Sequence, residues 1–128
     1  MESRKLLNLL LYLLSIHSIC VGLALIFSPP EVFAYFGYNP VTERFFPIQG
    51  GIFHIIMGIA YYMAARLSDR ERGLILLTIV AKFTATVFLI VDFLLIHHVW
   101  MVLLSGIVDG LMAAVILIVY LKYKKEQG

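Results

Sequence analysis

Two charged residues, Lys82 and Asp109, lie in the middle of long apolar stretches of the sequence. A charged side chain at the centre of a bilayer costs about 3 kcal/mol even on insertion scales, so such residues usually face a bundle interior. There they pair with one another or mark a functional path. The sequence therefore predicts a helical membrane protein with a polar centre.

Two histidines, His17 and His54, lie at a similar depth in other apolar stretches. We counted depth from the basic residue at the end of each predicted helix, on the side that holds the chain termini, at about 1.5 Å per residue. On this count His17, His54 and Asp109 lie about 18–20 Å deep, and Lys82 about 15 Å. Side chains lean toward the N-terminus of their helix, so His54 and Asp109 should meet first. Lys82 is long enough to reach Asp109 too. We predict a Lys82–Asp109–His54 cluster, with His17 at the same level but without an assigned partner.

A third acidic residue, Asp92, is about 15 Å further along its helix than Lys82 and cannot pair with it. Gln49, Arg44 or His97 are its expected partners. Tyr61 shares a helical stripe with His54 and three small residues, which turns it toward the polar centre. The candidate residues for a ligand site or buried polar cluster are His17, Gln49, His54, Tyr61, Lys82, Asp92 and Asp109.

The composition places the chain in a lipid environment. Of its 128 residues 62% are hydrophobic and 14% charged, whereas soluble domains are roughly half apolar and a quarter charged. The net charge of +2 is small, and the basic residues cluster at predicted helix ends, so we expect no nucleic-acid partner. Cys20 is the only cysteine, which excludes an internal disulfide.

The elements that must position these residues are predicted to be all-α. A helix needs about 20 residues to cross the hydrocarbon core, and four segments of one domain, 1–128, satisfy this. The predicted spans are 6–27, 47–65, 73–96 and 99–121. A short interfacial helix is predicted over 29–36, with Ser28 as its N-cap and Gly37 as its stop. A similar capping pattern, Ser68 to Glu71, predicts that the third span begins near Asp69.

Basic residues predict the orientation of the four-helix bundle. One side holds eight, Arg4, Lys5, Arg66, Arg70, Arg72, Lys122, Lys124 and Lys125, and the other holds Arg44. The positive-inside rule then places both termini in the cytoplasm.

Several functions fit a buried polar cluster. It could bind a hydrophobic small molecule, a quinone or lipid, or it could relay protons in a transporter that works as a homo-oligomer. His17 and His54 could ligate a b-type haem, although no cofactor is required. The cluster could also only fix helix pairing, in a structural bundle or accessory subunit. The sequence contains no nucleophile with its base, phosphate loop or metal-ligand spacing, so it does not indicate an enzyme.

The small and basic residues follow a further pattern across the spans. Its members are Arg44 before the second span, Gly50, Gly51 and Gly58 within it, Arg66 at its close, Lys82 in the third span, and Asp109 and Gly110 in the fourth. In this the chain resembles the DoxX-like and BphX-like small bacterial membrane proteins. The resemblance implies a left-handed four-helix architecture in the bacterial inner membrane. Some members are associated with quinone or redox systems, which implies a redox complex as partner; no catalytic residue carries over.

Overall fold

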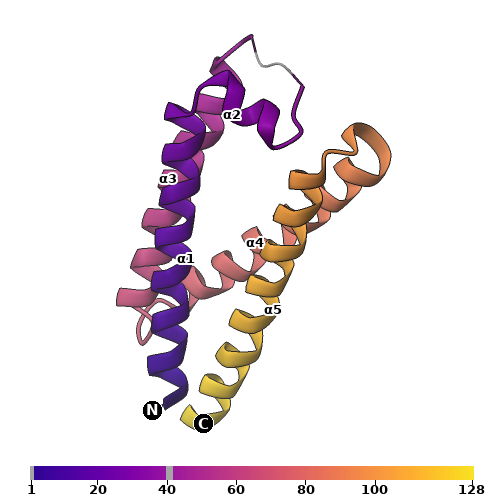
Figure 1. Ribbon diagram of the computed structural model, residues 1–128. Coiled ribbons are helices and arrows are strands. Elements are labelled where there is room, and N and C mark those ends of the chain that lie inside the picture. Colours follow the sequence, from indigo (N-terminus) through magenta and orange to yellow (C-terminus); the bar gives the residue numbers. More distant parts are fainter. Residues whose placement is uncertain (1, 40–41) are drawn as a thin grey trace.

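The computed structural model describes residues 2–39 and 42–128, and this part of the chain is helical without strands. Four helices are long and apolar enough to cross a membrane, which confirms the predicted fold class (Figure 1). A short helix lies between the first two, as predicted. The elements are α1 (Glu2–Phe27), α2 (Pro30–Tyr35), α3 (Phe45–Arg66), α4 (Arg72–Asp92), the π-helical turn η1 (Phe93–His97) and α5 (Trp100–Gln127).

The four long helices form two pairs, α1 with α3 and α4 with α5. We call the end that holds both termini and the α3–α4 turn the terminal end, and the opposite end the α2 end. The pairs meet in one core at the terminal end and diverge toward the α2 end (Figure 1). The core residues are Leu7, Leu11, Leu14, Tyr61, Ala64, Ala65, Ile75, Ile79, Ile116, Val119, Tyr120 and Tyr123.

Glycines bring α1 and α3 into backbone contact. A Cβ atom on Gly22 would lie 2.6 Å from the carbonyl oxygen of Gly51, and one on Gly58 would lie 2.6 Å from Cγ1 of Ile19. Lipid gives helices no hydrophobic reason to associate, so close packing of small residues is what holds such a pair. The α1–α3 pair is therefore joined along its length, including the half beyond the shared core.

The α4–α5 pair uses the small residues of α5 in the same way. Cβ atoms on Gly106 and Gly110 would meet Ile90 at 3.1 Å and Thr86 at 3.1 Å respectively. Beyond the pair, η1 widens the end of α4, and His98 closes it with a left-handed backbone (φ 46°). His98 Nδ1 lies 2.6 Å from the Phe93 carbonyl oxygen, at the end of the helix.

The α2 segment links the two pairs at the α2 end. The Phe36 and Trp100 rings lie 6.1 Å apart, and Gly37 (φ 90°) ends the segment against Trp100. The predicted cap was wrong by one residue: Pro29, not Ser28, is the N-cap, and Pro30 takes the first helical position. Proline suits that position, since its missing N–H would have no helical partner there.

The second predicted cap was also wrong, because α4 begins at Arg72 rather than near Asp69. Asp69 is instead held by α1 and α5: Arg4 Nη2 lies 2.7 Å from Oδ2, and the Tyr123 hydroxyl donates to Oδ1 at 3.1 Å. The amides of Arg70 and Glu71 donate to the Leu67 carbonyl and so form a turn. Contacts between helices thus displaced the local cap.

Candidate functional site

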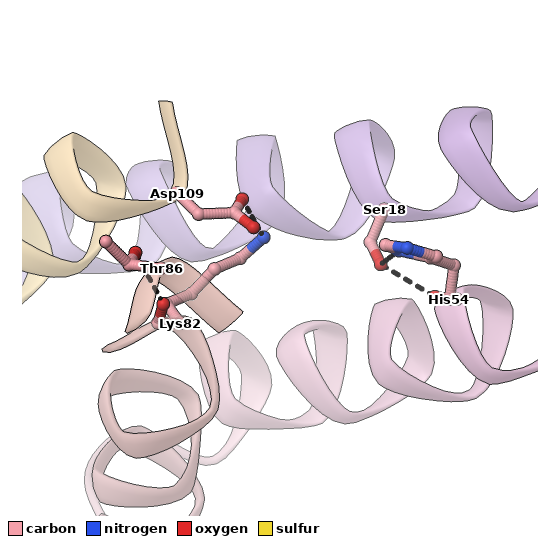
Figure 2. Close-up of polar contacts among 5 residues, drawn as sticks. All are labelled: Ser18, His54, Lys82, Thr86 and Asp109. Carbon is pink, nitrogen blue, oxygen red and sulfur yellow. Dashed lines mark hydrogen bonds and ion pairs between the residues drawn. The ribbon is translucent and has the colours of Figure 1, made fainter. Parts of the chain in front are cut away.

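A buried ion pair joins α4 to α5. Lys82 Nζ lies 2.9 Å from Asp109 Oδ1, and the side chains are only 5% and 13% exposed (Figure 2). The ammonium also lies 5.6 Å from the centre of the Tyr61 ring on α3, within the range of a cation–π interaction. Three of the predicted site residues, from three helices, are therefore in one cluster.

The ion pair lies where the shared core ends. Lys82 follows the core residue Ile79 by one turn, about 4.5 Å along α4, and Asp109 precedes buried Ala113 by one turn of α5. Thr86 donates to the Lys82 carbonyl at 2.8 Å and packs on Gly110. On the α2 side of this level, the two pairs part (Figure 1).

His54 takes another partner than the one we predicted. Among the described residues no hydrogen bond joins His54 to Asp109; Ser18 on α1 donates to the His54 carbonyl at 2.7 Å and lies 3.5 Å from its Nδ1 (Figure 2). The prediction of His54–Asp109 as the first contact was wrong, because the lysine stem on the neighbouring α4 brings Nζ to the carboxylate. His54 stays half-buried on the α1–α3 pair.

Sequence reasoning missed two serines on α1. Ser15 donates to the Gly58 carbonyl at 2.6 Å, one turn before Ser18 makes its contact with His54. Both hydroxyls are buried and face the glycine stripe of α3. Their spacing of three residues, opposite small residues, was the available signal, since serine often hydrogen-bonds across membrane helices.

His17 lies one turn beyond the core residue Leu14, at the level of the ion pair, and is half-buried. Its Nδ1 atom is buried, and within the described part of the chain it has no hydrogen-bond partner. An unsatisfied buried polar atom is unfavourable by roughly 1–3 kcal/mol. His17 is thus a polar group of this level whose hydrogen bonding the described residues leave unsatisfied. We call His17, Lys82 and Asp109 the polar layer; His54 lies about two turns of α3 from Tyr61, displaced from this level (Figure 2).

Two other predicted residues lie away from the polar layer. Asp92 meets His97, one of its three expected partners, with His97 Nδ1 2.9 Å from Oδ1. Arg44 instead donates to the Ile26 carbonyl at 2.9 Å, and Gln49 is exposed on α3. Asp92, His97 and Tyr38 help to line a pocket of about 420 Å³ at the α2 end. Burial, and then the Asp92 carboxylate, raise the pKa of Tyr38 above its usual range.

The packing of α1 on α3 bears on the haem hypothesis. His17 and His54 lie within the stretch where Gly22, Gly51 and Gly58 hold the two helices in contact. A porphyrin would have to separate those helices, so the two histidines do not form a ready bis-axial site. Across residues 2–39 and 42–128, no three His, Cys, Asp or Glu side chains are placed to hold a metal ion.

The fold and the polar layer define a class: a small, helical, multi-pass membrane protein with an ion pair buried between its helices. No protein-family model, no curated protein and no solved structure matches this chain.

Proposed function

We propose that the protein binds a hydrophobic small molecule with a polar head, of the quinone or lipid class, between the diverging halves of its two helix pairs. The observation that carries this proposal is the position of the polar layer at the boundary where four-helix packing ends. A ligand head would reach the ion pair and His17, while its apolar part would lie between the pairs.

The surroundings of the polar layer support such a ligand. His17 offers a buried nitrogen that no described residue pairs with, and Tyr61 offers an aromatic face beside the ammonium. The α2 segment covers the far end through the Phe36–Trp100 contact. The sides face lipid, so a membrane-soluble molecule would enter from the bilayer. Binding sites of this kind combine mostly apolar walls with a few placed polar groups.

The test replaces the ion pair by apolar residues of similar size, Lys82→Met with Asp109→Leu, which commonly preserves or raises stability. Wild-type and variant protein would be purified, their bound lipids and quinones extracted, and the extracts identified by mass spectrometry. A quinone or defined lipid enriched in the wild type and lost in the double variant is expected. Thr84→Val, an exposed change on the same helix, is the control and should retain it. Bulk phospholipid alone in both extracts would contradict the proposal.

A second candidate, proton-coupled transport by a homo-oligomer, is favoured by one observation. The unpartnered His17 nitrogen and the Lys82–Asp109 pair lie at one level, and such groups relay protons in membrane proteins. Asp109→Asn in reconstituted vesicles should then abolish a proton-linked flux. A variant that loses thermal stability but keeps its flux would exclude this role.

The setting of the protein is also a proposal. The excess of basic residues at the terminal end supports a cytoplasmic position for both termini, and the resemblance to DoxX-like proteins supports a bacterial inner membrane and a redox-complex partner. In a Cys20→Ser background, a cysteine at exposed Asn39 should react with an impermeant reagent in whole cells, whereas one at exposed Arg70 should not. Labelling at position 70 and not at position 39 would contradict the predicted orientation and place both termini outside the cytoplasm.

A further inference from the structure

The pocket at the α2 end is separate from the polar layer and has its own chemistry. Its volume of about 420 Å³ is within the range that holds small ligands. Its described lining residues come from two parts of the fold: residues 38–39 and 42–43 on one side, and the end of α4, η1 and the start of α5 on the other. The lining residues that matter here are Tyr38, Glu43, Asp92, His97, Val99 and Val102.

The charge of this pocket is negative. The Asp92 side chain is 13% exposed, and His97 Nδ1 contacts one of its oxygens. In the part of the chain that the structure describes, no hydrogen bond reaches its other oxygen, Oδ2. Glu43 contributes a second carboxylate, which accepts one bond from the Phe45 amide at 3.0 Å.

Among the described residues of this end, the only arginine does not contact the pocket carboxylates. Arg44 follows Glu43 in the sequence, but its guanidinium donates to the Ile26 carbonyl at the end of α1. Neither lysine nor arginine is among the lining residues. His97 occupies only one oxygen of the Asp92 carboxylate, and a partly desolvated carboxylate with an oxygen left over can attract a cation.

The walls select the kind of cation. Tyr38 supplies an aromatic ring with a neutral phenol, and burial and the Asp92 carboxylate raise its pKa above the usual range. Val99 and Val102 supply apolar surface. Aromatic and apolar walls around a carboxylate suit an alkylammonium group, whereas a metal ion needs several close ligands, and the described residues offer no group of three.

We propose that the α2-end pocket binds an organic monocation, a primary to quaternary alkylammonium group, between Asp92, Glu43 and the Tyr38 ring. This site goes beyond the proposed function and does not rest on it. The ammonium group could belong to a soluble amine or to the choline headgroup of a lipid, and the experiment separates these two sources.

The chain contains one tryptophan, which reports on this site. Trp100 directly follows the pocket residue Val99, and its ring contacts Phe36 and Gly37. Protein in nanodiscs of phosphatidylglycerol would be titrated with tetrapropylammonium chloride while Trp100 emission is followed. Sodium chloride at equal ionic strength is the reference. A saturable change with the organic cation alone is expected, and equilibrium dialysis with labelled tetrapropylammonium measures the same affinity directly.

Variants make the test specific. Asp92→Asn and Glu43→Gln each remove one charge with little change of shape and should weaken binding by about tenfold or more. Glu31→Gln is the matched control, since Glu31 is an exposed acid of the same end outside the pocket lining. The Lys82→Met, Asp109→Leu double variant should keep its cation affinity, so failure here and failure of the proposed function can be distinguished. Circular dichroism verifies the fold of each variant.

Nanodiscs of phosphatidylcholine separate the two sources. A choline headgroup in the pocket would compete and lower the apparent tetrapropylammonium affinity relative to phosphatidylglycerol discs, whereas equal affinities indicate a soluble amine. Three results would overturn the proposal: no saturable signal in either disc, an equal loss in Glu31→Gln, which would mean general surface attraction, or tighter binding of propanesulfonate than of the cation.

Discussion

The Lys82 ammonium and the Asp109 carboxylate stabilise each other's charge only while both are present. Each is almost fully buried, so removal of one partner leaves the other without compensation. The intact pair therefore adds little net stability, whereas removal of one partner is strongly destabilising. The same reasoning applies to Tyr61, whose ring faces the ammonium and would face an uncompensated charge without Asp109.

We predict that Asp109→Leu and Lys82→Met alone each lower the free energy of unfolding by about 3 kcal/mol, through the uncompensated partner. The double variant should return to within about 1 kcal/mol of wild type, because an apolar pair packs without desolvation of charge. Unfolding in mixed micelles of rising dodecyl sulfate content, followed by circular dichroism, measures the wild type, the two single variants and the double variant, which together form a double-mutant cycle. Additive losses would show that the two residues do not interact.

At the other end, Tyr38 gives the structure a dependence on alkaline pH. Burial and Asp92 favour the neutral phenol, so the folded pKa is above the unfolded value of about 10. A raised pKa of this sign contributes stability that is complete below about pH 10 and is lost as the pH rises through the folded pKa. Between about pH 9 and 11, wild-type stability should fall more steeply than that of Tyr38→Phe. Equal slopes would mean that Tyr38 is not perturbed.

At the scale of elements, the α1–α3 pair depends on backbone contact, and two neighbouring glycines allow a matched test. A Cβ on Gly51 would lie 2.6 Å from the Gly22 carbonyl oxygen, whereas a Cβ on Gly50 would lie 3.8 Å from Leu25 Cδ1. Gly51→Ala should destabilise by about 1–3 kcal/mol through overpacking. Gly50→Ala should be neutral or stabilising, since alanine favours a helix over glycine. Equal effects would contradict close packing at Gly51.

The helices were predictable from the sequence, and their ends only in part. Apolar length and the helical stripe of Gly51, His54 and Tyr61 indicated four long helices and one face of α3. The cap expected at Ser68–Glu71 failed because Asp69 found partners on α1 and α5. Local sequence patterns indicate where a helix could begin or end in isolation, and contacts between helices determine which of these ends forms.

For the whole molecule, the depth of the polar residues along their helices was predictable from the sequence, and the partners of their side chains were not. Counting residues placed Lys82 and Asp109 at one level with His17, and the structure has them together at the boundary of the core. Which side chains touch also depends on how far apart the helices lie. Since α1 and α3 pack as a separate pair, His54 contacts Ser18 on α1 instead of Asp109 on α5. The divergence of the two pairs has no signature in hydrophobic periodicity.

Because the two helix pairs diverge, we predict that they move relative to each other more at the α2 end than at the terminal end. The shared core holds the terminal end, whereas at the α2 end the Phe36–Trp100 contact is one of the described links between the pairs. Fewer buried contacts allow larger local excursions. In a Cys20→Ser background, spin labels at exposed Phe53 and Val91 would measure the distance between the pairs at the α2 end. Labels at exposed Met63 and Leu77 would do so at the terminal end.

Double electron–electron resonance should give a distance distribution for Phe53–Val91 roughly twice as wide as that for Met63–Leu77. The reason is that sparsely packed segments of a protein have lower local stability and move further. Trp100→Ala removes the aromatic link, so it should widen the first distribution and leave the second unchanged. A ligand between the pairs would narrow the first distribution, which connects this measurement to the proposed function. If both distributions are equally narrow without a ligand, the α2 end is held by contacts other than those between Phe36 and Trp100, and the ligand would have to enter a closed bundle.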